Sequence, residues 1–266
     1  MRLLTTAAAA LAITAAVQSP VWADVTIKEV ISRKAGSQNA KTERTTVVKG
    51  LAMWVEARRG NDRQTTVYDA ATGRITVMNA GKRRAEIYEA PVVAAAVERK
   101  LPSERVTAEL AATGRSQEML GVMCNEYTFV IMAPIGPTSQ VLFSLRGSAW
   151  IAQDGPGRDE YMAFARAAEK AKFVFGDFES TRAVLALVRG QTELYRRIAA
   201  LGGMPYAIDL AFKFEGTGAA ISLVNKMASG TFFTASTAIG TDPISEEVFA
   251  VPAGWKTITK QPGARS

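Results

Sequence analysis

Acidic residues beside one glycine–proline turn are the first side chains in this chain that could do chemistry. Asp154 precedes the Gly-Pro-Gly turn at 155–157, and Asp159 and Glu160 follow it. Paired carboxylates can hydrolyse a glycosidic bond or hold a calcium ion. The same pattern is typical of a polar turn followed by a helix, whose first turn favours acidic side chains. We favour the second interpretation, so the sequence predicts no catalytic residue and no metal site here.

A single cysteine and the lack of histidine limit the chemistry further. Without histidine, Ser-His-Asp and Cys-His catalysis, imidazole acid–base chemistry and His-ligated metal sites are excluded. Cys124 lies in the apolar stretch 119–132, where we expect a buried, inert thiol, and it has no second cysteine for an intrachain disulfide. No glycine-rich phosphate-binding loop is present. We therefore predict a protein that is not an enzyme and has no cofactor.

Large apolar side chains at strand positions are the main candidates for ligand binding. A curved sheet would point many of them towards a helical cover, where they would line an apolar cavity. The alternative is an ordinary packed core, because most inward-facing aromatic residues simply fill space. The eight candidates are Trp54, Tyr68, Met78, Tyr127, Phe129, Trp150, Phe212 and Phe214.

Basic residues gather near predicted strand ends and turns. Cations at the rim of a sheet would suit an anionic amphipathic ligand or an anionic membrane surface, and ordinary solvated charge is the alternative. The formal net charge of +7, in an exported protein, points to anionic lipids or cell-wall polymers rather than nucleic acid. The basic set consists of Arg58, Arg59, Arg63, Lys82, Arg83, Arg84 and the helical pair Arg196 and Arg197.

Alternating apolar and polar residues predict antiparallel strands in the first third of the chain. One pair of these strands reads as a hairpin, because Asp69 and Gly73 supply the residue types that tight turns need. The expected strands are 24–34, 42–58, 64–69, 74–79 and 83–89.

Two helical segments and further strands are expected after this region. The helical segments are about 91–112 and 158–201, with Gly190 as a kink or break in the second. The order lacks the strict alternation of a parallel sheet, so we predict an α+β fold, a curved antiparallel β-sheet forming an incomplete barrel under a helical lid. A single domain would cover 24–266. The later strands are expected within 116–154 and at 206–215, 219–227 and 231–239.

The first 23 residues read as a cleaved signal peptide. Arg2 is followed by an alanine-rich apolar stretch of about 15 residues, short of the roughly 20 that span a bilayer. Small residues then lead to an expected cleavage after Ala23. We therefore expect export to the periplasm as a soluble protein.

The order of turns, aromatics and strand patterns resembles a family of exported bacterial proteins with the lipoprotein-carrier-like half-barrel fold, akin to LolA and LolB. That resemblance implies an incomplete antiparallel barrel around helices that act as a lid, with space for lipid acyl chains between them. No individual ligand-binding residue is carried over from those carriers. The resemblance rests on KGLAMWVEAR, TTVYDAATGRITVMNAGKRRAEIYE, EMLGVMCNEYTF, GSAWIAQDGPGRDEYMAF, GGMPYAIDLAFKFEG and FAVPAGWK.

Two functional hypotheses follow. The first is a periplasmic binding or carrier protein for a hydrophobic or amphipathic ligand, such as a lipid or the acyl part of a lipoprotein. The second is a non-enzymatic structural or interaction protein of the cell envelope with a filled core. An elongated apolar cavity beneath the helices would favour the first, and a filled core with an exposed patch elsewhere would favour the second.

Overall fold

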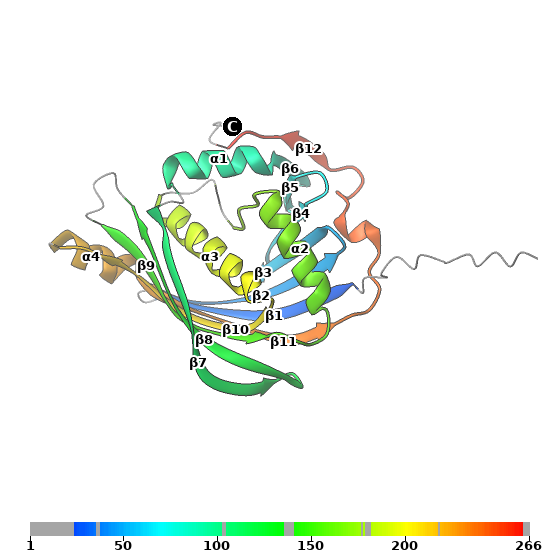
Figure 1. Ribbon diagram of the computed structural model, residues 1–266. Coiled ribbons are helices and arrows are strands. Elements are labelled where there is room, and N and C mark those ends of the chain that lie inside the picture. The colour runs from blue at the N-terminus through cyan, green and yellow to red at the C-terminus, as the bar shows by residue number, and fades with distance from the viewer. Residues whose placement is uncertain are drawn as a thin grey trace, which may run out of the picture.

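One large open sheet forms the frame of the protein (Figure 1). The computed structural model describes residues 24–35, 38–102, 105–135, 141–176, 178, 182–217 and 219–262. The expected signal peptide lies outside these residues. The strands are β1 (Val25–Ala35), β2 (Gln38–Lys49), β3 (Ala52–Arg59), β4 (Asp62–Asp69), β5 (Arg74–Asn79), β6 (Arg84–Glu89), β7 (Thr107–Met119), β8 (Val122–Pro134), β9 (Leu142–Ala152), β10 (Met204–Glu215), β11 (Gly230–Gly240) and β12 (Lys256–Thr259).

The twelve strands follow the order β12-β6-β5-β4-β3-β2-β1-β11-β10-β9-β8-β7. All neighbours are antiparallel except β12 and β6, which are parallel. The sheet curves strongly but does not close, so β12 and β7 remain at its two edges (Figure 1). The predicted large, curved, antiparallel sheet of an α+β protein is therefore confirmed.

Helices α1 (Ala90–Lys100), α2 (Arg158–Lys170) and α3 (Arg182–Ala200) lie inside the curve of the sheet (Figure 1). A fourth helix, α4 (Ala219–Ala228), extends beyond one end of the sheet, and a short 3-10 helix, η2 (Glu246–Phe249), precedes β12. None of the described helices is long and apolar enough to cross a membrane.

The strand β10 shows how the sequence pattern sets the two faces. Leu210, Phe212 and Phe214 are buried, while Asp209 and Lys213 between them are exposed. This alternation is the one expected for a strand with one face on the core. The inner face of the sheet is therefore apolar and requires cover.

The stretch 42–58 is not one long strand, so that prediction was wrong. Gly50, with φ of +54°, and Leu51 form a tight turn, and the chain folds back so that Val48 pairs with Met53. Glycine adopts a positive φ without the steric cost that other residues meet, which makes the turn possible inside an alternating pattern. As a result, Val48 and Met53 share one face.

Two other assignments also change. The first helix ends at Lys100, ahead of Pro102, and residues 107–112 belong to β7, where they pair with β8 instead of extending the helix. Residues 219–227, expected as a strand, lie in α4. Over a run this short, the spacing of apolar residues does not distinguish a strand from a helix. The backbone N–H and C=O of Phe214 are bound by the side-chain amide of Asn225 in α4, at 2.7 Å each, rather than by another strand.

Gly190 neither kinks nor divides α3, which runs unbroken over Arg182–Ala200. A Cβ at this position would overlap Cδ1 of Leu145, a fully buried residue of β9. Gly190 is therefore a point of close approach between helix and sheet, and its small size permits the contact.

We expect Gly190→Ala to lower the free energy of unfolding by about 1–2 kcal/mol, because overpacking a buried contact outweighs alanine's better helix propensity. Gly240→Ala is the matched control, since no atom lies within 4 Å of a Cβ there. Urea unfolding of the two variants measures the difference. Equal stability of both variants would contradict this account of the contact.

Candidate functional site

The eight predicted ligand-binding residues do not line one cavity. They divide among three apolar clusters of the described residues. The first cluster contains Tyr68, with Trp150 partly buried at its margin. The second contains Phe129, Phe212 and Phe214, with Tyr127 packed against them. The third contains Met78 and Trp54.

The third cluster lies on the other face of the sheet. Met53 belongs to the first cluster, and because successive side chains of a strand alternate, Trp54 points the opposite way. The C-terminal residues Phe249, Val251 and Trp255 pack against this outer cluster. Trp54 and Met78 therefore do not face the helices.

Trp150 is also separated from the second cluster. Its neighbours Ala149 and Ile151 pack in that cluster, so the indole projects from the opposite side of β9. The guanidinium of Arg115 lies 6.0 Å from the centre of the indole ring, which is cation–π distance. The residues left facing the helices are Tyr68, Tyr127, Phe129, Phe212 and Phe214.

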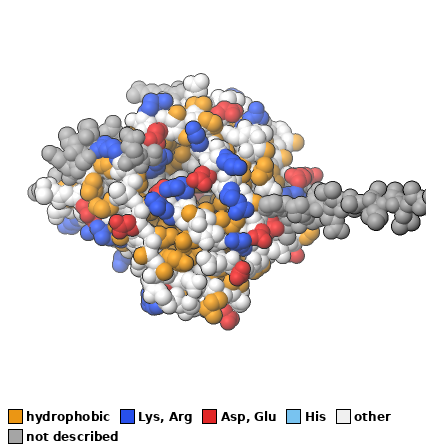
Figure 2. Space-filling model, in the orientation of Figure 1, with side chains coloured by type: hydrophobic (Ala, Val, Ile, Leu, Met, Phe, Trp, Pro, Cys, Tyr) orange, Lys and Arg blue, Asp and Glu red, His pale blue; other side chains and the backbone are white. Residues whose placement is uncertain are grey.

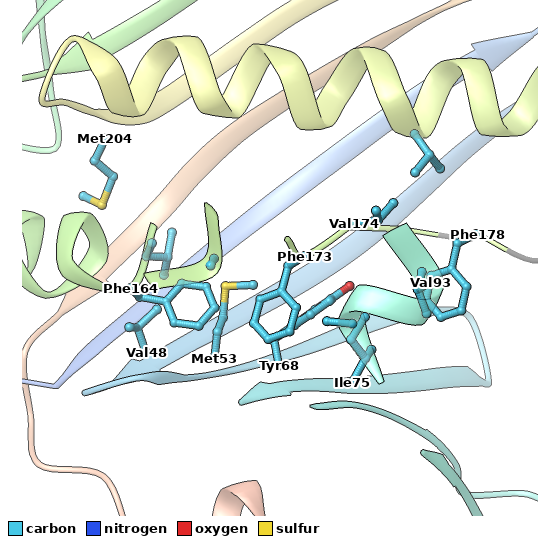
Figure 3. Close-up of a cluster of buried hydrophobic side chains, with 14 of the residues drawn as sticks. Val48, Met53, Tyr68, Ile75, Val93, Phe164, Phe173, Val174, Phe178 and Met204 are labelled. Atoms are coloured by element: carbon cyan, nitrogen blue, oxygen red, sulfur yellow. The ribbon is translucent and has the colours of Figure 1, made fainter. Parts of the chain in front are cut away.

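The connection between α2 and α3 fills the middle of the concave face. Phe173, Val174 and Phe178 of this connection are buried in the first cluster. In Figure 3, Phe173 lies beside Tyr68 of β4, and Phe178 lies beside Val93 of α1. The space beneath the helices is therefore occupied by side chains from an irregular segment, not only by those of the helices and the sheet.

Tyr68 is the sheet residue on which this connection rests. Its ring centre is 5.4 Å from that of Phe173 and 4.9 Å from that of Phe175. The backbone N–H of Gly176 donates a hydrogen bond of 3.4 Å to the Tyr68 hydroxyl. Burial raises the pKa of Tyr68 to about 12, because the phenolate would lose its hydration, and the Gly176 N–H and the charge of Arg44 offset only part of this. The hydroxyl therefore stays neutral.

A partly buried ion pair interrupts the apolar surface beneath the helices. Glu29 of β1 and Arg44 of β2 are directly opposed in the sheet. Their side chains meet in two hydrogen bonds of 2.7 and 2.8 Å, and their exposed fractions are 10% and 24%. Tyr161 of α2 and Tyr195 of α3 lie close enough to interact with this pair.

The environment keeps Arg44 charged. Burial alone would lower the pKa of its guanidinium, but Glu29 and Tyr195 raise it, and the result is a pKa well above the ordinary value. Burial raises the pKa of Tyr161, with smaller contributions from Tyr195 and Glu29. Arg44 therefore stays charged where the sheet comes close to Tyr161 of α2 and Tyr195 of α3.

Sequence reasoning missed both the ion pair and the connection. Opposite charges at facing positions of two neighbouring strands can predict an ion pair, but only when the register of the two strands is known. The second strand was expected to begin at residue 42, whereas β2 begins at Gln38, so the predicted strands did not place Glu29 opposite Arg44. Phe173 and Phe175 were read as part of a helical segment, whereas α2 ends at Lys170.

The acidic turn is what the preferred interpretation expected. Asp159 and Glu160 lie in the first turn of α2, and Asp159 pairs with Arg158 at 2.5 Å. Among the described residues, no group of three or more Asp, Glu or Cys side chains is placed to hold a metal ion.

Comparisons with known proteins give distant structural neighbours. No protein-family model matches this chain, and no curated protein sequence matches it. One similar solved structure is that of PNGF-II, 7% identical, with a TM-score of 0.37. The match covers 90% of this chain, which spans only 31% of that chain.

Two further neighbours match over most of their own length. A protein domain from Vibrio parahaemolyticus, assigned to outer membrane lipoprotein sorting, is 5% identical over 86% of this chain and 89% of its own, with a TM-score of 0.35. A DUF1329 family protein from Desulfovibrio piger is 8% identical over 87% and 91%, with a TM-score of 0.25. The neighbours thus include a lipoprotein-sorting domain, the class that the sequence resembles. Because these scores are low, function has to be argued from the residues of this chain.

We expect Arg44→Met to lower the free energy of unfolding by about 3–5 kcal/mol, because it leaves the Glu29 carboxylate buried without a partner. Replacing both members, Arg44→Met with Glu29→Met, restores most of that loss, since two apolar side chains then fill the space. Urea unfolding in a double-mutant cycle measures the coupling. Additive losses in the double variant would show that the two side chains do not act as a pair.

Proposed function

We propose that the protein binds a hydrophobic or amphipathic ligand, such as a lipid or the acyl part of a lipoprotein, between the concave face of the sheet and its helices. The observation that supports this most directly is the α2–α3 connection. An irregular segment, rather than a helix or a strand, supplies Phe173, Val174 and Phe178 to the centre of the apolar interior. In this proposal these side chains occupy the ligand's place when no ligand is bound.

The connection is held mainly by contacts that an acyl chain can replace. The contacts of its described part with the strands include ring packing on Tyr68 and Tyr88, apolar packing in the first cluster and the hydrogen bond from Gly176. Two of its residues, Lys172 and Gly176, have positive φ values of 57° and 113°. Apolar contacts are not directional, so a hydrocarbon chain can take over the surface that the phenylalanines leave.

The ends of α2 and α3 that lie away from this connection are the ends close to the Arg44–Glu29 pair. Tyr161 is near the start of α2 and Tyr195 near the end of α3, and both lie by the Arg44–Glu29 pair. The connection joins the other end of each helix. In this proposal the segment between them moves outward while the other ends of both helices stay on the sheet.

The second candidate function is an interaction protein of the cell envelope with a permanently filled core. Packing of the described interior favours it, because Tyr68 and Tyr88 are 5% and 1% exposed and are covered by aromatic rings. In both proposals the protein acts in the periplasm after removal of its signal peptide and is not an enzyme.

Uptake of a dansylated fatty acid separates the two candidates. We expect the wild-type protein to bind this probe, and Phe173→Ala to bind it on the order of tenfold more tightly, because a weakened connection raises the fraction of molecules open to ligand. Fluorescence titration measures the affinity. Native mass spectrometry of protein purified without detergent tests for a lipid bound from the cell.

Phe143→Ala is the matched control, because it removes an equally buried ring from the second cluster. It should lose stability without gaining affinity. Phe173→Leu provides a milder variant if the alanine variant fails to fold. Absence of probe binding in folded wild-type protein and in a folded Phe173 variant would reject the carrier and favour the filled-core protein.

A further inference from the structure

The antiparallel topology collects several basic turns at one rim of the sheet. Consecutive hairpins place every second connection at the same end, so the β1–β2, β3–β4 and β5–β6 connections share a rim. Ala35, at the end of β1, pairs with Gly230, at the start of β11, so α4 also lies at this rim. Stretches far apart in the sequence therefore form one edge of the molecule.

Eight exposed cations along this edge have no acidic partner among the described residues. We call them the basic rim. Two exposed acids, Glu43 and Asp62, lie among them. Other cations of the same edge are neutralised, as in the pairs of Arg63 with Glu56 and Arg84 with Glu86. The basic rim consists of Arg33, Lys34, Lys41, Arg59, Lys82, Arg83, Lys226 and Lys256.

The basic set expected from the sequence falls mostly here. Arg58, Arg59 and Arg63 lie at the β3–β4 turn. Lys82, Arg83 and Arg84 lie at the β5–β6 turn. Arg196 and Arg197 do not belong to this edge, because they lie on α3 and pair with Glu193.

The opposite rim carries mainly acidic side chains. Exposed acids follow the ends of β9 and β11 there, while the cations Lys49, Arg74 and Arg158 of that rim are each paired with acids. The charge of the protein is therefore divided between two ends, and an anionic surface would attract one end and repel the other. The exposed acids are Asp154, Asp242, Glu246 and Glu247.

The helix α4 adds an exposed apolar element to the basic rim. Leu223 and Val224 are 59% and 38% exposed. Asn225 ties the helix to the backbone of Phe214, so α4 is held in place although its apolar side chains face solvent. Figure 2 shows hydrophobic side chains beside Lys and Arg, with some acids, at the left end that carries α4.

A shallow hollow lies next to this helix. It has a volume of about 290 Å³, and its floor includes Ala211, Gly230 and Thr231. Arg146 and Lys213 line it, and both pair with Glu215, at 3.1 and 3.5 Å. Two cations share one carboxylate, which leaves a net positive charge beside the apolar helix.

We propose that the basic rim and α4 dock the protein on an anionic lipid surface. The cations lie along one edge, as contact with an extended charged plane requires, and each contributes about fivefold to partitioning near such a surface. Leu223 and Val224 enter the boundary between headgroups and acyl chains. Nucleic acid or an acidic protein would use the cations but has no need for a protruding apolar helix. The proposal does not depend on a ligand beneath the helices.

Vesicle co-sedimentation tests this docking directly. The vesicles contain equal parts of phosphatidylglycerol and phosphatidylcholine, with phosphatidylcholine alone as the reference. We expect binding to the anionic vesicles only, weakened by added salt. The variant Lys34→Glu/Arg59→Glu/Lys82→Glu should lose roughly 100-fold in partitioning, and Leu223→Asp roughly tenfold.

Two control variants separate docking from general charge or hydrophobicity. Lys28→Glu/Arg166→Glu/Lys170→Glu makes the same change in net charge outside the basic rim. Leu51→Asp changes a leucine that is 47% exposed at the opposite rim. Both controls should retain vesicle binding, and all variants should retain uptake of the dansylated fatty acid if the proposed function holds.

Equal loss of vesicle binding in the rim variant and its control, or equal binding to both kinds of vesicle, would overturn the docking proposal. Dimers that Leu223→Asp converts to monomers, without vesicle binding, would assign α4 to a second copy of the chain instead. Probe uptake without vesicle binding would reject docking and leave the proposed function intact. Vesicle binding without probe uptake would support docking and count against the proposed ligand binding.

Discussion

The need to keep the concave face of an open sheet away from water shapes the rest of this protein. Twelve strands curve without closing, so the apolar inner face cannot be buried by the sheet alone. Three helices lie inside the curve, but a helix is a cylinder and leaves space against a curved surface. The aromatic connection between α2 and α3 fills that space, with Phe173 and Phe178 packed against Tyr68 and Tyr88.

The Arg44–Glu29 pair has a different role in the same interior. Burying two charges costs solvation energy that their attraction only partly recovers, so such a pair is poor evidence of added stability. The pair differs from the apolar contacts around it because its hydrogen bonds are directional. Apolar surfaces can slide over one another, whereas a guanidinium held by a carboxylate is a directional group, and it lies where Tyr161 and Tyr195 of the two helices come close to the sheet.

The sequence predicted those elements whose signal is local. The alternation in β10 and the turn between Asp69 and Gly73 needed only neighbouring residues, and both are found in the structure. The face on which each aromatic lies depends on turn position, because a shift of one residue moves a side chain to the opposite face. Because the turn at Gly50 was missed, Trp54 was counted among the residues that face the helices, whereas it pairs with Val47 and lies on the outer face. The connection containing Phe173 has no periodicity of its own, so no local pattern could have identified it.

The charged edges show that a surface can be encoded without any local cluster. The basic residues of β1, the β3–β4 turn and the β5–β6 turn are separated in the chain by about two strands each. Since antiparallel strands return to the same end after every second turn, this spacing becomes an edge only in the folded sheet. The same rule sends the intervening turns to the acidic end. The topology that creates an apolar concave face thus also gives the molecule two electrically different ends, and orientation at a charged surface follows from the fold itself.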